Sequence, residues 1–298
     1  FVTKLHEDKP RKLSEAENIE IQHECGKKQP ENRLLDGEKF DLADRPWPVF
    51  VGLDYKEKDQ PNLKIDVVCT ASFISKRHVL TARSCFQSRE YNYVASNHAS
   101  NRHHKFVHVM YGTLSWNEHK GGQRVRARKI MFPTSHYADS DIAIIEIEKD
   151  IQFTNKIRPL CIPTDDDDQQ FLNSHLDFFG GGRIAREGKD SSSGELMTFR
   201  QVDFLTDGDV KFTKNTDATW SLLLREHKER KWAETAWGDA GGPLVRTRKD
   251  GRHVVFGVFT LKGNSTGLVN EKYTAVNKHR DDICRMSGVC PQGPVGEQ

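Results

Sequence analysis

Apolar residues in this chain recur in short runs, separated by turn-forming residues, from about residue 40 onward. No long stretch with helical spacing stands between these runs, which is the pattern of an all-β protein built from many short strands. We expect strands in the runs VFVGL (49–53), DVVC (66–69), ASFI (71–74), HVLTA (78–82), FVHVMYG (106–112), DIAIIEI (141–147), GGPLV (241–245) and HVVFGVFTL (253–261).

Two segments have the spacing of a helix instead. Ser14 and Glu17 stand in the arrangement of a capping box, and apolar residues follow at helical intervals. This predicts a helix from about Ser14 to Glu24, the alternative being a solvated tail in which the helix forms only transiently. A second helix is expected near the end of the chain, around Ala275 to Met286.

Composition and charge exclude several classes of protein. The 298 residues suffice for one large β domain or two ordinary ones, and 36% hydrophobic with 30% charged residues indicates a soluble protein. No run approaches the ~20 apolar residues of a membrane span. A net charge of +2 is too small to favour nucleic acid as a partner.

Cysteine usage indicates the compartment. The six cysteines are even in number and widely spaced, and they include no CxxC pair of the kind that metal sites favour. Three disulfides formed in an oxidising environment are the better interpretation, so we expect a secreted, extracellular protein. The residues are Cys25, Cys69, Cys85, Cys161, Cys284 and Cys290.

Four stretches together resemble the trypsin family of serine proteases. CTASFISKRHVLTARSC (69–85) resembles its Cys-Gly-Gly-Ser-Leu-Ile and Leu-Thr-Ala-Ala-His-Cys pattern. SDIAIIEIEKDIQFTNKIRPLCIP (140–163) resembles Asn-Asp-Ile-Ala-Leu-Leu followed by Pro-Ile-Cys-Leu-Pro. WGDAGGPLV (237–245) resembles Gly-Asp-Ser-Gly-Gly-Pro-Leu-Val, and DRPWPVFVGL (44–53) resembles the entry strand. The order and spacing agree over residues 34–287.

The resemblance implies an all-β fold of two six-stranded antiparallel β-barrels with the site at their junction and a C-terminal helix. It divides the chain into a disulfide-tethered N-terminal pro-segment, 1–33, and a trypsin-like domain, 34–298. The segment KLSEAENIEIQHECG (12–26) is similar to a nematode-type branch of trypsin-like proteins.

The catalytic triad implied by the family is incomplete in this chain. A serine, a histidine and an aspartate share the reaction in the family, and the matching positions hold Ala240, Ser84 and Asp141. A methyl group forms no acyl intermediate, and a serine hydroxyl does not titrate near neutral pH, so we expect no peptide hydrolysis by the family mechanism. The alternative is an endopeptidase inactivated by engineering at Ala240 or using a non-standard group, although the first option leaves Ser84 unexplained.

The family's substrate pocket is expected to be filled. Leu261 and Lys262 stand where the pocket strand has tryptophan and glycine, and Glu271 stands where the wall has another glycine. Glu234 matches the pocket base, where Lys262 is its expected partner because an unpaired buried carboxylate is costly.

The backbone of the site is expected to survive. By resemblance, Gly238 and Ala240 supply the oxyanion-hole N–H groups, and Asp239 receives a new N-terminal ammonium after cleavage between Arg33 and Leu34. The alternative is that this junction is never cut and that Asp239 only caps local backbone.

Disulfide pairing follows from the same resemblance. It implies Cys25–Cys161, which tethers residues 1–33, and Cys69–Cys85 beside the triad position. Elimination then leaves Cys284–Cys290.

A basic run offers a replacement for the lost reaction. QRVRARKI places Arg124, Arg126 and Arg128 at alternating positions, hence on one face of a strand, with Lys129 beside them. Guanidinium groups make bidentate contacts with sulfate and phosphate, so the expected partner is a sulfated glycan or an unidentified protein. The alternative is a solvated face neutralised by neighbouring carboxylates.

Two other polar clusters give no indication of a metal site. Neither the histidines at 98, 103, 104 and 108 nor the acidic run 164–170 has the spacing of a metal site, so we expect no metal and no cofactor. Asn264 begins a glycosylation sequon, which by resemblance to the family stands at the mouth of the former substrate cleft.

These observations favour a secreted protease homologue that acts by binding, as a decoy, a cofactor or a modulator of a protease cascade or host defence. The other hypotheses are an enzyme of the same fold and a structural carrier whose surface patches bind nothing.

Overall fold

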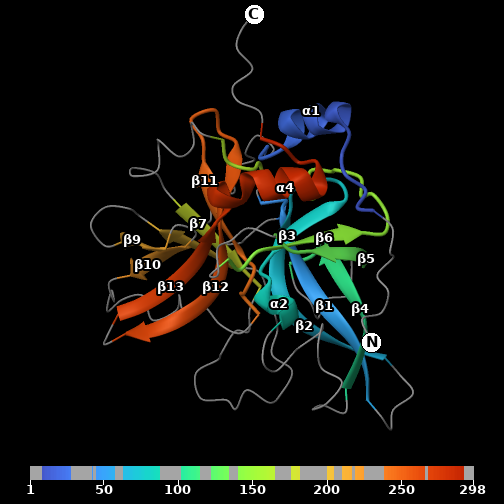
Figure 1. The fold of residues 1–298 in the computed structure, drawn as a ribbon, viewed down its shortest axis with the longest axis horizontal. Helices are drawn as coiled ribbons and strands as arrows, with labels where there is room; N and C mark the ends of the chain where they lie inside the picture. Colours follow the sequence, from blue (N-terminus) through green and yellow to red (C-terminus); the bar gives the residue numbers. More distant parts are fainter. Residues whose placement is uncertain are drawn as a thin grey trace, which may run out of the picture.

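A computed structural model describes residues 9–27, 42, 45–57, 63–87, 102–114, 122–133, 140–164, 176–181, 200–204, 210–216, 219–224, 238–265 and 268–291. The chain forms two β-units with helices at their edge (Figure 1).

The first unit is a closed barrel of six antiparallel strands. Going round the barrel, the order is β1-β2-β3-β6-β5-β4, and β4 closes it by pairing with β1. The strands are β1 (Pro48–Glu57), β2 (Leu63–Phe73), β3 (His78–Thr81), β4 (Arg102–Tyr111), β5 (Gln123–Met131) and β6 (Ala143–Ile147).

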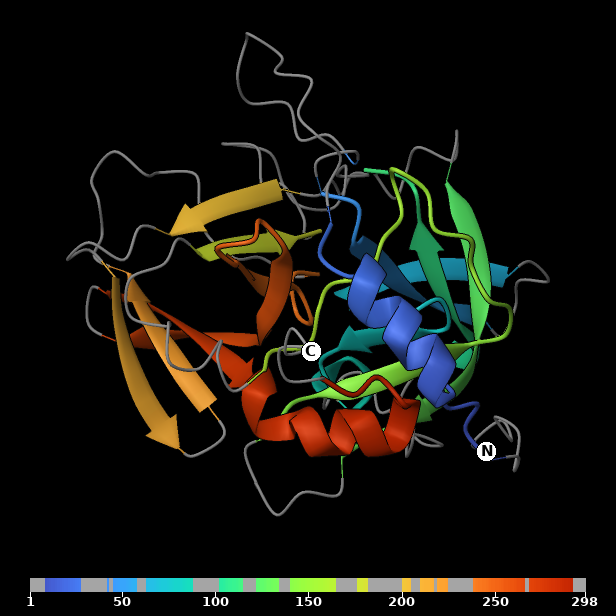
Figure 2. The same cartoon turned by 90° about the horizontal axis from the view of Figure 1, so that it is seen from above.

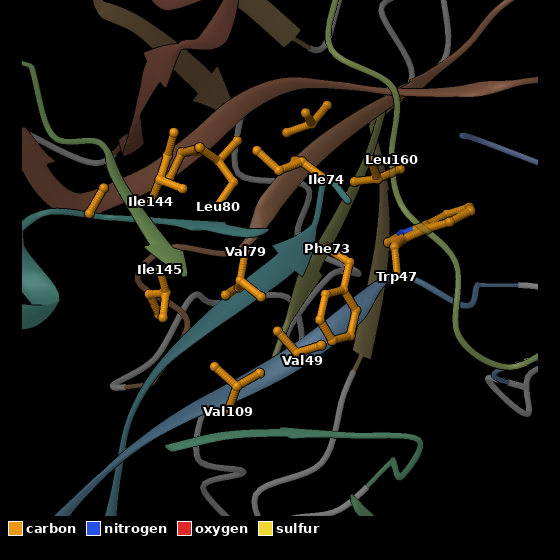
Figure 3. Packing of buried hydrophobic residues seen from close by; sticks show 14 of the residues in the cluster. Trp47, Val49, Phe73, Ile74, Val79, Leu80, Val109, Ile144, Ile145 and Leu160 are labelled. Carbon is orange, nitrogen blue, oxygen red and sulfur yellow. The ribbon is translucent and has the colours of Figure 1, made fainter. Parts of the chain in front are cut away.

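Alternation fills the inside of this barrel. Successive side chains of a strand point to opposite faces, and one set from several strands meets in the interior (Figure 3). This set contains Val49, Phe73, Val79, Val109 and Ile145, all buried.

Strand β6 is buried on both of its faces. Val79 and Ile145 are register partners, and so are the next pair along, Leu80 and Ile144, which therefore lie on the opposite face. All four residues are fully buried, so the outer face of β6 is covered by other parts of the chain. Glu146 on this strand is buried as well.

The second unit differs from the expected six-stranded barrel. Its described strands form one seven-stranded sheet in the order β8-β7-β11-β12-β13-β10-β9. The hairpin β9–β10 extends the sheet beyond β13, and β8 and β9, which stand at its two edges, do not pair with each other in the described ranges. The strands are β7 (Leu176–Gly180), β8 (Arg200–Phe204), β9 (Val210–Thr216), β10 (Thr219–Leu224), β11 (Pro243–Thr247), β12 (His253–Ser265) and β13 (Leu268–Ala275).

Both expected helices are present. α1 (Glu15–Glu24) begins after Ser14, whose side chain accepts from the Glu17 N–H while Glu17 reaches back to the Ser14 N–H. The C-terminal helix is a 3₁₀ turn, η2 (Val276–His279), continued by α4 (Arg280–Ser287). A short helix, α2 (Ser84–Gln87), follows β3.

Trp47 joins the two units. Its indole is fully buried and packs edge-on against Phe179 of β7 at 5.9 Å between ring centroids, and against His253 of β12 at 4.7 Å. The all-β fold with a closed six-stranded barrel, a second sheet and a C-terminal helix is therefore confirmed. In the described ranges the second unit is an open seven-stranded sheet, so its closure into a six-stranded barrel stays a prediction.

Candidate functional site

The chemistry-bearing positions meet where the two β-units join. Ser84 opens α2 after β3, and Asp141 precedes β6 in the first unit. Ala240 lies in the turn before β11 of the second unit. The Cys69–Cys85 disulfide links β2 to α2 and so fixes the start of α2 against the barrel.

Ser84 is hydrogen-bonded twice to one buried carboxylate. Its backbone N–H donates to Oδ1 of Asp141 at 2.6 Å, and its hydroxyl donates to Oδ2 at 2.8 Å. The N–H of Asp141 in turn donates to Oγ1 of Thr274 on β13 at 3.2 Å, which ties the aspartate to the second unit.

The environment of Asp141 acts on its pKa in two directions. Burial raises the pKa of this carboxyl above its ordinary value, while hydrogen bonds from Ser84 and from the Arg83 backbone oppose the rise. The Ser84 hydroxyl gives its proton to this bond, and it has no basic nitrogen with which to accept one. The pair can therefore hold a fixed hydrogen bond but cannot serve as a base of imidazole type.

The turn before β11 is held by a network centred on Thr70 of β2. The Thr70 hydroxyl is buried, donates to the carbonyl of Gly238 at 2.9 Å and accepts from the Gly181 N–H at 2.8 Å. The Thr70 N–H donates to the carbonyl of Ala240 at 2.9 Å. Sequence analysis missed this residue, and the available signal was a threonine where the family pattern Cys-Gly-Gly has its first glycine.

Glycines are required by the geometry of this turn. Gly241 has a φ of 85°, and a Cβ there would collide with the Thr81 hydroxyl and the Thr70 carbonyl. Gly238 also has a positive φ, 102°. The Ala240 side chain is a methyl group packed against the core, so the turn presents no nucleophile at this position.

Asp239 is buried and packs against Gly180 of β7, where a side chain would collide with its carboxylate. Its expected partner after cleavage, Leu34, and the preceding Arg33 lie outside the described residues. Use of the activation junction stays a prediction.

The pocket residues are placed only in part. Glu234 lies outside the described residues. Leu261 and Lys262 are in β12 and Glu271 is in β13, where the backbone register sets Lys262 opposite Glu271. Asn264 lies two residues further along β12, and its glycosylation stays a prediction.

The three disulfides of the structure are the pairs expected from the sequence. Cys25 is bonded to Cys161, Cys69 to Cys85, and Cys284 to Cys290.

The basic strand differs from its expectation. Arg124 and Arg126 of β5 are exposed, and the Arg126 guanidinium stacks on Phe106 of β4 at 4.2 Å from the ring centroid. Arg128 is only 14% exposed, because its Nη1 pairs with Oε1 of Glu146 at 2.8 Å. Lys129 follows a β-bulge and is half-buried. The expected face of three arginines is therefore reduced to two.

No group of three or more His, Cys, Asp or Glu in the described ranges could hold a metal ion. His98 and residues 165–170 of the acidic run lie outside those ranges. None of the helices that the structure describes is long and apolar enough to cross a membrane.

Replacing Ser84 by alanine tests the hydrogen bond to Asp141. The pKa of Asp141 is higher in the folded protein than in the unfolded chain. The stability that this group contributes is therefore full below the unfolded pKa and is lost as pH rises through the folded pKa. Loss of the hydroxyl raises the folded pKa further. We expect Ser84→Ala to lower the free energy of unfolding by about 1–3 kcal/mol at pH 7 and by less at pH 5, measured by urea denaturation.

Ser287→Ala is the matched control. The Ser287 hydroxyl donates to the Ile283 carbonyl at 2.7 Å and bonds no carboxylate. The free energy of unfolding that Ser287→Ala removes should therefore be the same at pH 5 and pH 7. A Ser84→Ala effect that is equally insensitive to pH contradicts the prediction.

Comparisons with known proteins agree with this architecture. A family model described as Trypsin matches residues 37–283. The chain is 24% identical over 288 residues to phenoloxidase-activating factor 1 of Holotrichia diomphalia, covering 88% of this chain and 72% of that protein. It is 27% identical over 207 residues to a venom protease of Bombus pensylvanicus, covering 67% of this chain and 77% of that protein. With most of its length matched by the family model and with a closed six-stranded barrel, a second sheet and a C-terminal helix, the chain belongs to the trypsin family.

Proposed function

We propose that this chain is a secreted, non-catalytic member of the trypsin family that acts by binding a partner. The observation that carries the proposal is the contact between Ser84 and Asp141. A hydroxyl occupies the position of the family's general base and donates its proton to the aspartate, so nothing there can take a proton from a nucleophile.

Ala240 removes the nucleophile as well. Removal of single triad members already lowers catalysis by several orders of magnitude, and what remains comes from the oxyanion hole and substrate binding. In this proposal Gly238 and Ala240 keep the backbone of that hole because the Thr70 network requires the same turn. Glu234, Leu261, Lys262 and Glu271 fill the former pocket.

A secreted location is supported by the three disulfides, because such bonds persist in oxidising compartments. In this proposal residues 1–33 are a pro-segment tethered through Cys25, residues 34–298 are the protease-like domain, and Asn264 carries a glycan.

The binding surface that we propose is the exposed pair Arg124 and Arg126. These residues are two apart on β5, and the stacking of Arg126 on Phe106 holds one guanidinium in place. His108 is the register partner of Arg126 on β4. Two guanidinium groups on one strand suit a sulfated glycan, because its sulfate groups repeat along the chain.

The names of the relatives favour a role beside proteases. One is called a phenoloxidase-activating factor and the other a venom protease. A protein that keeps the protease frame without its reaction is suited to act as a decoy or modulator in a protease cascade.

The second candidate is an endopeptidase in which Ala240 replaces an original serine, or which uses another group. Ser84 distinguishes the candidates, because restoring a serine at 240 leaves the base missing. We expect the chain and its Ala240→Ser variant both to leave a peptide-substrate library uncleaved, after cleavage at Arg33. Turnover by Ala240→Ser alone, at a rate near that of an intact protease, supports the engineered enzyme and contradicts the proposal.

Glycan binding has its own test. Arg124→Ala with Arg126→Ala should lower the salt concentration that elutes the protein from heparin, because two cations leave the surface. Lys156→Ala with Lys249→Ala removes two exposed cations elsewhere and is the matched control. Equal elution shifts for both pairs indicate nonspecific charge only and contradict the proposed surface.

A further inference from the structure

Residues 9–27 lie along the outside of the first barrel and also contact the C-terminal helix α4 and the loop after it. Figure 2 shows α1 crossing the strands of the barrel beside α4. The segment contacts both β-units through side chains and backbone, in addition to its disulfide.

The first contact is an arginine that meets a buried carboxylate. The Glu146 side chain has no exposed surface, and both the N–H and the Nε of Arg11 bind it, at 3.0 and 2.6 Å. Arg128 contributes the second cation. Another nitrogen of the same guanidinium, Nη2 of Arg11, donates to the Ile147 carbonyl. Removing one of its two cations from a buried carboxylate destabilises the folded state strongly. Glu146 therefore requires the side chain of Arg11 at this place.

The second contact fixes the start of α1. The carboxylate of Glu17 completes the capping box with Ser14, and it also pairs with Lys76 at 2.9 Å and Arg77 at 2.5 Å. These partners lower the pKa of Glu17 to about 2. Because the ordinary value is 4.5, this stabilisation is complete above that pH and is lost as pH falls toward 2.

The third contact joins α1 to the C-terminal loop. The Asn18 amide donates to the carbonyl of Cys290 and accepts from its N–H, each at 3.0 Å. The Leu13 N–H donates to the Ser287 carbonyl at 2.8 Å. Gly288 has a φ of 75°, and a Cβ there would lie 2.5 Å from the Leu13 backbone. The loop closed by Cys284–Cys290 therefore leaves space for the backbone of the segment at Gly288.

The fourth contact reaches the second unit. The Gln22 carbonyl accepts from Nη1 of Arg252 at 2.9 Å. The Gly26 carbonyl accepts from the His253 N–H at 2.9 Å, and the Gly26 N–H donates to the Pro159 carbonyl at 2.8 Å. The segment therefore bonds to the barrel, to the second sheet and, through Pro159, to the part of the chain that follows β6.

We propose that residues 9–27 are a docking segment recognised by a composite surface of both β-units without need of the Cys25–Cys161 bond, and that they clamp the units together. The surface fits a peptide with an arginine for Glu146, a Ser-x-x-Glu helix start and an asparagine in the next residue. Cleavage at Arg33 would leave such a segment bound as a second chain. This inference does not depend on the absence of catalysis.

The test separates docking from the covalent tether. In the full chain, Cys25→Ser and Cys161→Ser are combined, and residues 28–33 are replaced by the recognition sequence of a site-specific protease. After cleavage, gel filtration at 0.15 M salt and mass measurement show whether the segment stays with the domain. We expect it to stay, and to separate when Arg11→Ala and Asn18→Ala are added.

Lys12→Ala with Glu20→Ala is the matched control, because both side chains are exposed and lie beside the contact residues. This pair should leave the segment bound. Immediate separation of the segment from the cysteine-free protein with no other substitution overturns the proposal, since only the disulfide then holds it.

A second measurement applies if the cysteine-free chain does not fold. In the uncut, disulfide-bonded protein, Gly288→Ala should speed hydrogen exchange of the α1 amides by about tenfold or more, because it displaces the Leu13 backbone. Gly251→Ala is its control, with a φ of 81° and no atom within 4 Å of the added Cβ. Unchanged exchange in α1, or an equal change in both variants, counts against docking.

Discussion

A buried carboxylate must be given hydrogen-bond donors or cations, and this constraint explains two parts of the structure. At the junction of the β-units, Asp141 receives the hydroxyl and the N–H of Ser84. On the outer face of the barrel, Glu146 receives Arg11 and Arg128. In the first case the donor is a serine hydroxyl, which cannot take up a proton as the family's histidine does. In the second, a cation from the N-terminal segment becomes part of the barrel.

The same logic explains why the turn around Ala240 persists without a nucleophile. Thr70 uses its hydroxyl and its N–H to hold the carbonyls of Gly238 and Ala240, and Gly241 leaves no room for a side chain. These contacts depend on the backbone and not on the side chain at position 240. The turn therefore belongs to the packing of β11 against the barrel, and a change of serine to alanine leaves that packing intact.

Local signals in the sequence predicted most of the fold. The helix after Ser14 follows from a capping box, which needs only neighbouring residues. Five strands of the first barrel follow from their apolar runs, and β5 follows from its alternating arginines. Contacts between distant segments were not predictable in this way. Alternation placed Arg128 on a strand face but gave no sign of Glu146, and polar strands such as β8 and β9 lack the apolar runs that mark the others. The Ser84 and Ala240 positions came from motif spacing, whereas their geometry required the structure.

The most direct measurement of the central claim is labelling by a fluorophosphonate probe, which reacts with activated serines. Four proteins are compared after cleavage at Arg33: the chain itself, Ser84→His, Ala240→Ser and the double variant. If the family frame is intact and only two side chains are lost, the double variant alone is labelled, at position 240. Labelling of the unaltered chain or of Ser84→His contradicts the account, because another nucleophile would then be active.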